Sequence, residues 1–230
     1  VQTPPPALAV LPVGTGNDFF RMVGPSRDLP GAVDTLLGGR LRHFEVGRVS
    51  SSGGACHFGN LLGVGLDVEV LKRRPEFRRL PGLSQYLAAL LSAVASFSPV
   101  PLRVELLDLG KEVEGPVMLG ILTVGPSVAG GFFLSPQASP VDGYLDFCYV
   151  DPVGLGKVVR YVPRVLRGTH LRIPEFHHER VRRIRLSRPD GEPFFFELDG
   201  ELMPEQTTML DVEIKPEALP VLVPGEGGVS

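Results

Sequence analysis

The sequence has few of the features that mark secreted, membrane-spanning or nucleic-acid-binding proteins. Its 230 residues include two cysteines, Cys56 and Cys148, which is too few for a disulfide framework or a zinc motif. No apolar stretch reaches the roughly 18 residues that a membrane-spanning helix needs, and no charged-then-apolar signal segment opens the chain. The formal net charge of −3 argues against nucleic acid as a partner. A soluble, cytoplasmic protein is therefore expected.

The length and the first residues bear on domain organisation. With 43% hydrophobic residues, the chain is long enough for one large domain, or for one domain plus part of another. It begins with Val1, Gln2, Thr3 and three prolines, which is unusual for the start of a natural chain. This opening predicts that the sequence comes from the interior of a longer protein.

The most informative stretch is ALAVLPVGTGNDFFRM, residues 7–22, which predicts a strand, a glycine loop and a helix in succession. Residues 7–11 are apolar and end at Pro12, as in a buried strand that stops at a functional loop. In the helix, Phe20 can face a core while Arg21 reaches back toward the loop.

The loop has the composition of an anion-binding turn. Gly14 and Gly16 lack side chains, so the main-chain N–H groups around Thr15 can approach an anion closely. The helix that follows would direct the positive end of its dipole toward the same point. Asn17 or Asp18 suits the N-cap of this helix. The simpler interpretation is an ordinary tight turn, because such turns also use glycine and a capping Asx residue.

The full run is more specific than the glycine spacing alone. GTGNDFFR resembles the GTxNDxAR signature of the diacylglycerol kinase catalytic family, which includes bacterial lipid kinases and the sphingosine and ceramide kinases. Phe20 stands where that family has a small residue, a departure expected to alter packing more than phosphate contact. In that family the signature forms one wall of the ATP site. The resemblance implies that five residues bind the nucleotide: Gly14, Thr15, Gly16, Asn17 and Asp18.

A second segment carries the resemblance further. Taken alone, the pair Asp142–Gly143, followed by Asp146, indicates a turn before a strand. The run SPQASPVDGYLDFCYV, however, follows the family pattern APxASxxDGxLDxxxV almost throughout. In relatives the first aspartate of this turn helps to hold a structural Mg²⁺, an ion that prefers oxygen ligands. The resemblance therefore implies a metal site made of Asp142 and the backbone carbonyls of Ser139 and Tyr144, with Asp146 as a strand-start or network residue.

Two Asp-Gly-Glu triplets follow, at 190–192 and 199–201, and their contexts differ. The first lies between expected strands and is best interpreted as a hairpin turn. The second follows an apolar run, so its carboxylates emerge at the end of a buried strand, where desolvation and nearby charge can shift a pKa. FELDGELM resembles the family's DGE motif, whose acidic residue is the base toward the lipid hydroxyl. Either Asp199 or Glu201 is the catalytic candidate.

Periodicity and turn residues predict the remaining elements. The fold class is α+β and mainly β: an antiparallel two-layer β-sandwich-like domain with a few helices, plus the last strand-loop-helix of an α/β nucleotide-binding domain. The expected divisions are residues 1–39, the remnant of the nucleotide-binding domain, residues 40–218, the β-rich domain, and residues 219–230, a strand and tail expected to return to the first division. Strands are expected at 41–49, 55–62, 102–109, 116–124, 145–150, 180–187, 193–198, 209–215 and 219–223, and helices at 30–37, 83–97 and 155–166.

The resemblance spans nearly the whole chain and implies an ATP- and Mg²⁺-dependent lipid kinase that phosphorylates a hydroxyl of a diacylglycerol-like lipid. Such an enzyme would be cytoplasmic and would touch the membrane surface transiently. Residues 72–80 hold five basic residues and one glutamate, which indicates either a solvated loop or attraction to anionic headgroups. The sequence identifies neither the lipid nor the oligomeric state.

One departure from the family pattern limits this interpretation. The family also carries a GGDGT phosphate-binding loop upstream of the GTxND segment, and no such stretch occurs in this sequence. Residues 1–230 alone are therefore expected to lack a complete ATP site and to be inactive. Two alternatives stay open, a noncatalytic lipid-binding or regulatory module and an NAD-kinase-like enzyme, although the DGYLD and DGE segments follow the lipid-kinase pattern.

Overall fold

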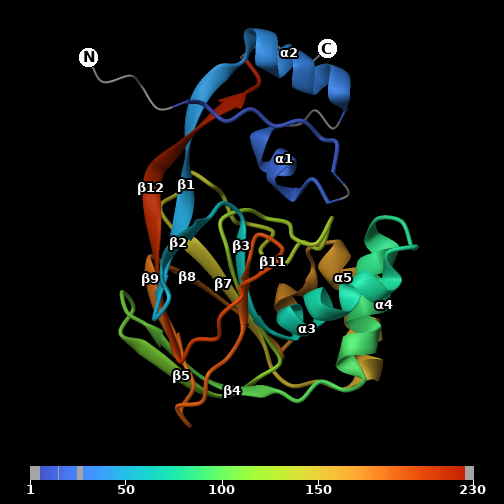
Figure 1. Ribbon diagram of the computed structural model, residues 1–230, viewed down its shortest axis with the longest axis vertical. Helices are drawn as coiled ribbons and strands as arrows, with labels where there is room; N and C mark the ends of the chain where they lie inside the picture. Colours follow the sequence, from blue (N-terminus) through green and yellow to red (C-terminus); the bar gives the residue numbers. More distant parts are fainter. Residues whose placement is uncertain (1–5, 15, 25–27, 226–230) are drawn as a thin grey trace.

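The computed structural model describes residues 6–14, 16–24 and 28–225, which form two six-stranded antiparallel sheets and several helices (Figure 1). This architecture confirms the predicted mainly β, α+β class. The order of strands in the first sheet is β2 (Gly54–Phe58), β1 (Arg40–Ser51), β12 (Met209–Val223), β9 (Arg183–Ser187), β4 (Val100–Leu106) and β5 (Lys111–Val117). In the second it is β11 (Glu201–Leu202), β10 (Phe196–Leu198), β3 (Leu61–Gly65), β6 (Leu119–Thr123), β7 (Leu145–Val150) and β8 (Phe176–Val181).

The main hydrophobic core lies between the two sheets. Successive side chains of a strand point to opposite faces, so each strand of the second sheet sends alternate residues into this core. In β10, Phe196 and Leu198 face the first sheet and belong to the same core cluster as Leu62 of β3 and Phe147 of β7, from the second sheet. Glu197 lies between them in sequence and therefore points to the opposite face of the sheet.

Three helices cover that opposite face and make a third layer: α3 (Leu66–Arg73), α4 (Leu83–Val94) and α5 (Leu155–Leu166) (Figure 1). The turns η1 (Arg74–Phe77) and η2 (His170–Arg172) lie beside them in sequence. The apolar stripes of the helices pack on the sheet in two further clusters. α3 begins directly after β3, which ends at Gly65, whose φ of 78° favours glycine.

The first residues lie at one end of the sheets. There α1 (Asp18–Val23) and α2 (Leu29–Gly38) sit beside the outer ends of β1 and β12, which extend beyond the other strands (Figure 1). Val23 packs with Phe44 of β1 and Val221 of β12 in a separate small cluster. The predicted helices at 30–37, 83–97 and 155–166 are confirmed, the second with an earlier end. The predicted domain boundaries stay predictions.

Several predicted strands were wrong because contacts with distant residues divide them. The strand expected at 55–62 is two strands in different sheets, β2 and β3, since the Asp199 carboxylate binds the backbone between them. The strand expected at 180–187 also changes sheets, at Arg182. The N–H groups of Arg182 and Arg183 donate to the Asp108 carboxylate instead of extending β8.

Other predicted strands differ from the observed ones in their length or in the strand that they pair with. Residues 110–115, which separate the strands expected at 102–109 and 116–124, mostly belong to β5, which pairs with β4 as an edge strand, while β6 lies in the other sheet. The two strands expected at 209–215 and 219–223 are the single strand β12, bent at Glu217, whose φ is 51°. The strand expected at 7–11 does not form. Among the described residues it pairs only through one bridge from Leu8 to Val221.

Candidate active site

The predicted nucleotide loop folds onto itself through Asn17. This residue has a left-handed φ of 53° and directly precedes α1, but its side chain makes no capping hydrogen bond to the helix. Instead Oδ1 accepts from the Gly14 N–H at 3.0 Å, and Nδ2 donates to the Gly14 carbonyl at 2.8 Å. Asn17 therefore occupies the N-cap position that was predicted for Asn17 or Asp18, but it does not make the side-chain hydrogen bond of an N-cap. Thr15 lies outside the described residues, and nucleotide contact by this loop stays a prediction.

Asp18 and Arg21 connect α1 to a loop of the second sheet. The Asp18 carboxylate accepts hydrogen bonds from Ser127 Oγ at 2.9 Å and from the Gly130 N–H at 2.6 Å. Burial raises the pKa of Asp18, although these two hydrogen bonds act in the opposite direction. Arg21 Nη2 donates to the carbonyls of Gly16 and Gly130, so it reaches back toward the glycine loop as predicted.

The predicted metal turn has its carboxylate paired with arginine. Asp142 Oδ2 accepts from Arg180 Nη2 at 2.6 Å, and Oδ1 accepts from the Tyr144 N–H at 3.1 Å. The Arg180 guanidinium also lies 4.5 Å from the centre of the Tyr144 ring. Asp146, the expected network residue, is buried in β7 and bonds to His178 at 2.7 Å.

Glu45, which no motif in the sequence marks, holds this turn against β1. The pairing of β1 with β12 shifts register between Phe44 and Val46, so Glu45 leaves the ladder and its N–H donates to the Pro140 carbonyl at 2.8 Å. Its Oε1 accepts from the Gly143 N–H at 2.6 Å. Burial, opposed by this bond, raises the pKa of Glu45. A single glutamate in an otherwise ordinary strand gave no signal of this role.

The oxygen atoms of this turn fit a hard cation. Glu45 Oε2 is buried and receives no hydrogen bond from any described residue, and Asp142 is on the adjoining turn. Within the described ranges no group of three His, Cys, Asp or Glu side chains could hold a metal. An Mg²⁺ ion here would therefore need the predicted carbonyls of Ser139 and Tyr144 and bound water, which matches its ordinary coordination.

The second Asp-Gly-Glu triplet stands at the end of β10, as predicted. Asp199 has a left-handed φ of 51°, and its carboxylate accepts three backbone hydrogen bonds, from Gly59, Asn60 and Leu61, at 2.7 to 2.8 Å. Glu201 is exposed in β11. The first triplet is an exposed turn in which Asp190 pairs with Arg188. Only the second triplet is joined to the interior of the sheets.

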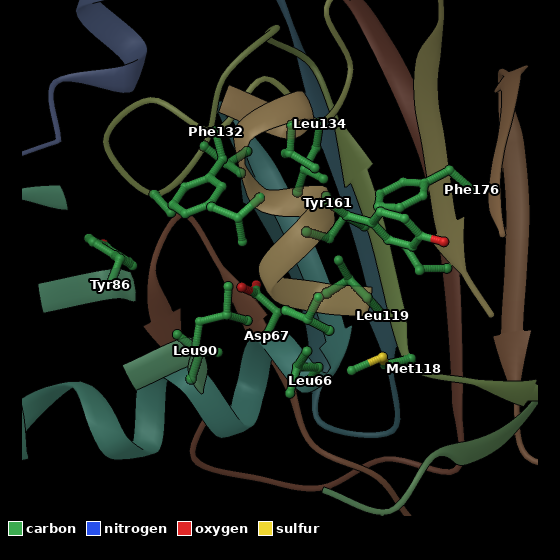
Figure 2. A pocket seen from close by; sticks show the side chains of 18 of the residues that line it. Leu66, Asp67, Tyr86, Leu90, Met118, Leu119, Phe132, Leu134, Tyr161 and Phe176 are labelled. Atoms are coloured by element: carbon green, nitrogen blue, oxygen red, sulfur yellow. The ribbon is translucent and has the colours of Figure 1, made fainter. Parts of the chain in front are cut away.

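An apolar cavity of about 110 Å³ lies between the second sheet and its helices. Figure 2 shows its walls converging from several elements, with Asp67 among the apolar side chains. The cavity has no signature in the sequence, because its lining comes from segments that are far apart in the chain. The lining includes Leu66, Leu90, Met118, Phe132, Leu134 and Phe176.

A pair of carboxyl groups lies at this cavity. The Asp67 carboxyl of α3 lines the cavity and lies beside the Glu197 carboxyl of β10, whose Oε2 accepts from the Gly200 N–H at 2.7 Å. Burial raises the pKa of both groups, and the charge of Asp67 raises that of Glu197 further. Gly200 is the centre of the second Asp-Gly-Glu triplet, so the pair joins the cavity to that triplet.

Comparison with known proteins places this arrangement in a family. Residues 60–223 match the model of the YegS C-terminal NAD kinase beta sandwich-like domain, and residues 2–49 match that of the diacylglycerol kinase catalytic domain. The chain belongs to the diacylglycerol-kinase-like lipid kinase family. The resemblance predicted from the GTGNDFFR, DGYLD and DGE segments is thereby confirmed.

Individual members of this lipid kinase family resemble the chain over most of its length. A diacylglycerol kinase of Bacillus subtilis (strain 168) is 30% identical over 198 residues, which cover 85% of this chain and 63% of that protein. One of Mycobacterium tuberculosis (strain ATCC 25618 / H37Rv) is 28% identical over 224 residues, covering 96% and 70%. The crystal structure of a diacylglycerol kinase from Bacillus anthracis str. Sterne shares the fold, with a TM-score of 0.73 and 21% identity, over 97% of this chain and 70% of that one.

Proposed function

We propose that this chain forms the lipid-recognising part, and one wall of the nucleotide site, of an ATP- and Mg²⁺-dependent kinase that phosphorylates a hydroxyl of a diacylglycerol-like lipid. The observation that carries the proposal is that β10 connects the apolar cavity to the second Asp-Gly-Glu triplet. Glu197 in this strand lies beside Asp67, which lines the apolar cavity, and Asp199 directly follows the last residue of the strand. A lipid with its acyl part in the cavity would therefore present its polar end near the acidic triplet.

The acidic triplet would accept the proton of the lipid hydroxyl as its oxygen attacks the transferred phosphoryl group. A carboxylate offers about four acceptor positions, and Asp199 uses three of them for backbone N–H groups. One position remains for a substrate proton, on a carboxylate that is held rigidly. Glu201, two residues later and exposed, is the alternative base.

The remaining predicted residues have supporting roles in this proposal. Gly14, Gly16 and Asn17 would contribute main-chain groups to the nucleotide wall, with Asp18 anchoring the wall to the sheet. Asp142, the carbonyls of Ser139 and Tyr144, and Glu45 would hold Mg²⁺. When bound near phosphate, Mg²⁺ neutralises negative charge, and in a structural position it fixes the turn.

Membrane contact is proposed at the segment between α3 and α4. Arg78, Arg79 and Leu80 are exposed there, and α4 continues into the wall of the cavity. Exposed arginines are attracted to anionic headgroups, which would bring the cavity to the cytoplasmic face of a membrane. No helix in the described part of the chain is long and apolar enough to cross a bilayer.

Transfer of labelled γ-phosphate from ATP to 1,2-dioctanoylglycerol tests the proposal. A chain that continues upstream of Val1 through a GGDGT segment should phosphorylate this lipid in the presence of Mg²⁺, and residues 1–230 alone should not. Turnover by residues 1–230 would contradict the expected incomplete ATP site. Lipid binding without turnover by the longer chain would favour the noncatalytic module instead.

A further inference from the structure

We propose that the outward side of α5, with the turn η2 that follows it, is a docking face for a membrane surface that contains anionic lipid. This inference rests on the proposed function and deepens it, because it adds a membrane contact on a helix that the proposed function does not use. The docking face consists of five cations and two aliphatic residues, all of them exposed: Lys157, Arg160, Arg164, Arg167, Arg172, Leu155 and Val159.

The charge of this segment is opposite in sign to that of the rest of the chain. Residues 152–174 contain five Lys or Arg residues and no Asp or Glu, so they carry a formal charge of +5. Because the whole chain carries −3, the remaining residues carry −8. An anionic surface therefore attracts this segment and repels most of the molecule, which sets the orientation in which the two meet.

Helical spacing gathers the cations on one side of α5. Arg160, Arg164 and Arg167 are four and three residues apart, which are neighbouring positions on the surface of a helix. Val158 and Val165, on the opposite side, are buried and line the apolar cavity. α5 belongs to the helical layer on the side of the second sheet away from the first sheet, so its cations face solvent (Figure 1).

Most of these cations have no carboxylate partner within the molecule. Lys157 pairs with Glu175, and Arg167 donates to a backbone carbonyl. Across the ranges that the structure describes, the other arginines of the docking face form no ion pair. On the first sheet, by contrast, ion pairs neutralise arginines of β1, β4 and β9. The charge on α5 is therefore available to an external anion.

The exposed aliphatic side chains favour a membrane over a soluble anion. Leu155 and Val159 are 43% and 54% exposed. At about 100° per residue, Val159 lies between the buried side of the helix at Val158 and the cationic side at Arg160. A helix that lies in a membrane interface has this arrangement, because its cations meet the headgroups while aliphatic side chains enter the acyl boundary. A nucleic acid or an acidic peptide would leave the aliphatic side chains in water.

Vesicle binding by residues 1–230 tests the charge of the docking face. The probes are phosphatidylcholine vesicles with and without about one third phosphatidylglycerol, which is anionic. Each arginine near an anionic surface contributes about 5-fold to affinity. We therefore expect binding to the anionic vesicles to weaken by at least about 10-fold in the triple variant Arg160→Gln, Arg164→Gln, Arg167→Gln.

A matched control removes the same number of exposed cations from the two sheets and the strand ends, through Arg42→Gln, Lys111→Gln and Arg183→Gln. Its affinity should stay within about 2-fold of that of the unaltered chain, since charges more than about 8 Å from the membrane are screened at physiological salt. An equal loss in the two triple variants would overturn the inference, because net charge alone would then account for binding. Tighter binding to a soluble oligonucleotide than to the vesicles would overturn it in favour of a nucleic-acid surface.

Insertion can be measured directly, because the sequence contains no tryptophan. The emission of Val159→Trp should move to shorter wavelength on anionic vesicles and be quenched by brominated acyl chains. Leu109→Trp, in the exposed turn between β4 and β5, is the control and should not respond. Leu80→Trp reports the separate contact proposed between α3 and α4.

The outcomes separate this inference from the proposed function. A response of Leu80→Trp without one of Val159→Trp would overturn the docking face and leave the proposed lipid kinase intact. Absence of vesicle binding by the unaltered chain would also overturn the docking face, whereas phosphorylation of 1,2-dioctanoylglycerol by the longer chain tests the kinase without vesicles. Insertion of Val159→Trp together with failure of that phosphorylation would support the docking face and contradict the proposed kinase.

Discussion

The Asp18 carboxylate in α1 accepts a 2.6 Å hydrogen bond from the backbone N–H of Gly130, in a loop that helps to line the apolar cavity. The neighbouring residues Val128 and Phe132 belong to the cavity wall. Ala129 and Gly130 both have positive φ, so the loop holds an uncommon backbone conformation that needs support. The predicted nucleotide wall and the apolar cavity therefore share one anchored loop.

Asp18→Asn should destabilise the fold through this loop. Asparagine can keep both contacts only with Oδ1 toward the Gly130 N–H and Nδ2 toward Ser127 Oγ, so the charge-assisted bonds become weaker neutral ones and the ion pair with Arg21 is lost. The expected loss is about 1 to 3 kcal/mol of unfolding free energy, measured by urea denaturation. Asp34→Asn, on the exposed side of α2, is the control and should change little. Equal stability of the two variants would show that the bonds of Asp18 contribute nothing.

Glu197→Gln should make the protein more stable at high pH. Because the folded-state pKa of Glu197 is raised well above its usual value, the folded protein holds a proton that the unfolded chain releases. Stability is then complete below the unfolded pKa and falls as pH rises toward the folded pKa. Glutamine does not titrate, so as pH rises above the usual glutamate pKa of 4.5 the variant should lose less stability than the unaltered protein. Thermal denaturation across this range measures the difference.

Glu192→Gln serves as the comparison for this experiment, because Glu192 lies in an exposed turn. The stability of Glu192→Gln should equal that of the unaltered protein at each pH. A Glu197→Gln profile parallel to that of the unaltered protein would mean that Glu197 ionises normally in the folded state.

Local sequence predicted the elements whose own pattern is strong. Residues 145–150 and 155–166 have the predicted bounds in β7 and α5, because alternation and helical spacing are complete within each segment. The strand breaks at Gly59 and Arg182 could not be predicted, since carboxylates of Asp199 and Asp108, far away in sequence, set them. Sheet membership is decided by such long-range contacts and not by local propensity.

The candidate site likewise contains residues that local sequence predicts and residues that only the fold brings together. The second triplet and the Asp142 turn are continuous motifs, so sequence alone pointed to them. Glu45 meets Gly143 across 98 positions, and Asp67 meets Glu197 across a longer gap, with no catalytic or ligand motif that marks either contact. Residues that become functional partners only through sheet pairing need the fold to be seen.

Mg²⁺ should stabilise residues 1–230 through the Asp142 turn. An ion that binds only the folded state raises the unfolding free energy by about 1.4 to 2.7 kcal/mol when its concentration is 10 to 100 times the Kd. Because Asp142→Ala also removes the contact with Arg180, the quantity to compare is the difference in Tm with and without Mg²⁺ within each variant. This difference should vanish in Asp142→Ala and shrink in Glu45→Gln.

Asp190→Ala removes an exposed carboxylate from a different turn and should leave the effect of Mg²⁺ intact. An unchanged effect of Mg²⁺ in Asp142→Ala would rule out the metal site at this turn.

Substitutions in the second Asp-Gly-Glu triplet should distinguish an effect on catalysis from an effect on folding. In the longer, active chain, Asp199→Asn or Glu201→Gln should lower kcat by at least about 100-fold if the substituted residue is the base. Asp199→Asn should also lose about 1 to 3 kcal/mol of stability, since an amide cannot accept all three backbone bonds, whereas exposed Glu201 should not affect folding. Measuring kcat and urea denaturation on the same preparations distinguishes the two effects, with Glu192→Gln as the silent control. Normal turnover in both second-triplet variants, or a damaging Glu192→Gln, would show that the base lies elsewhere.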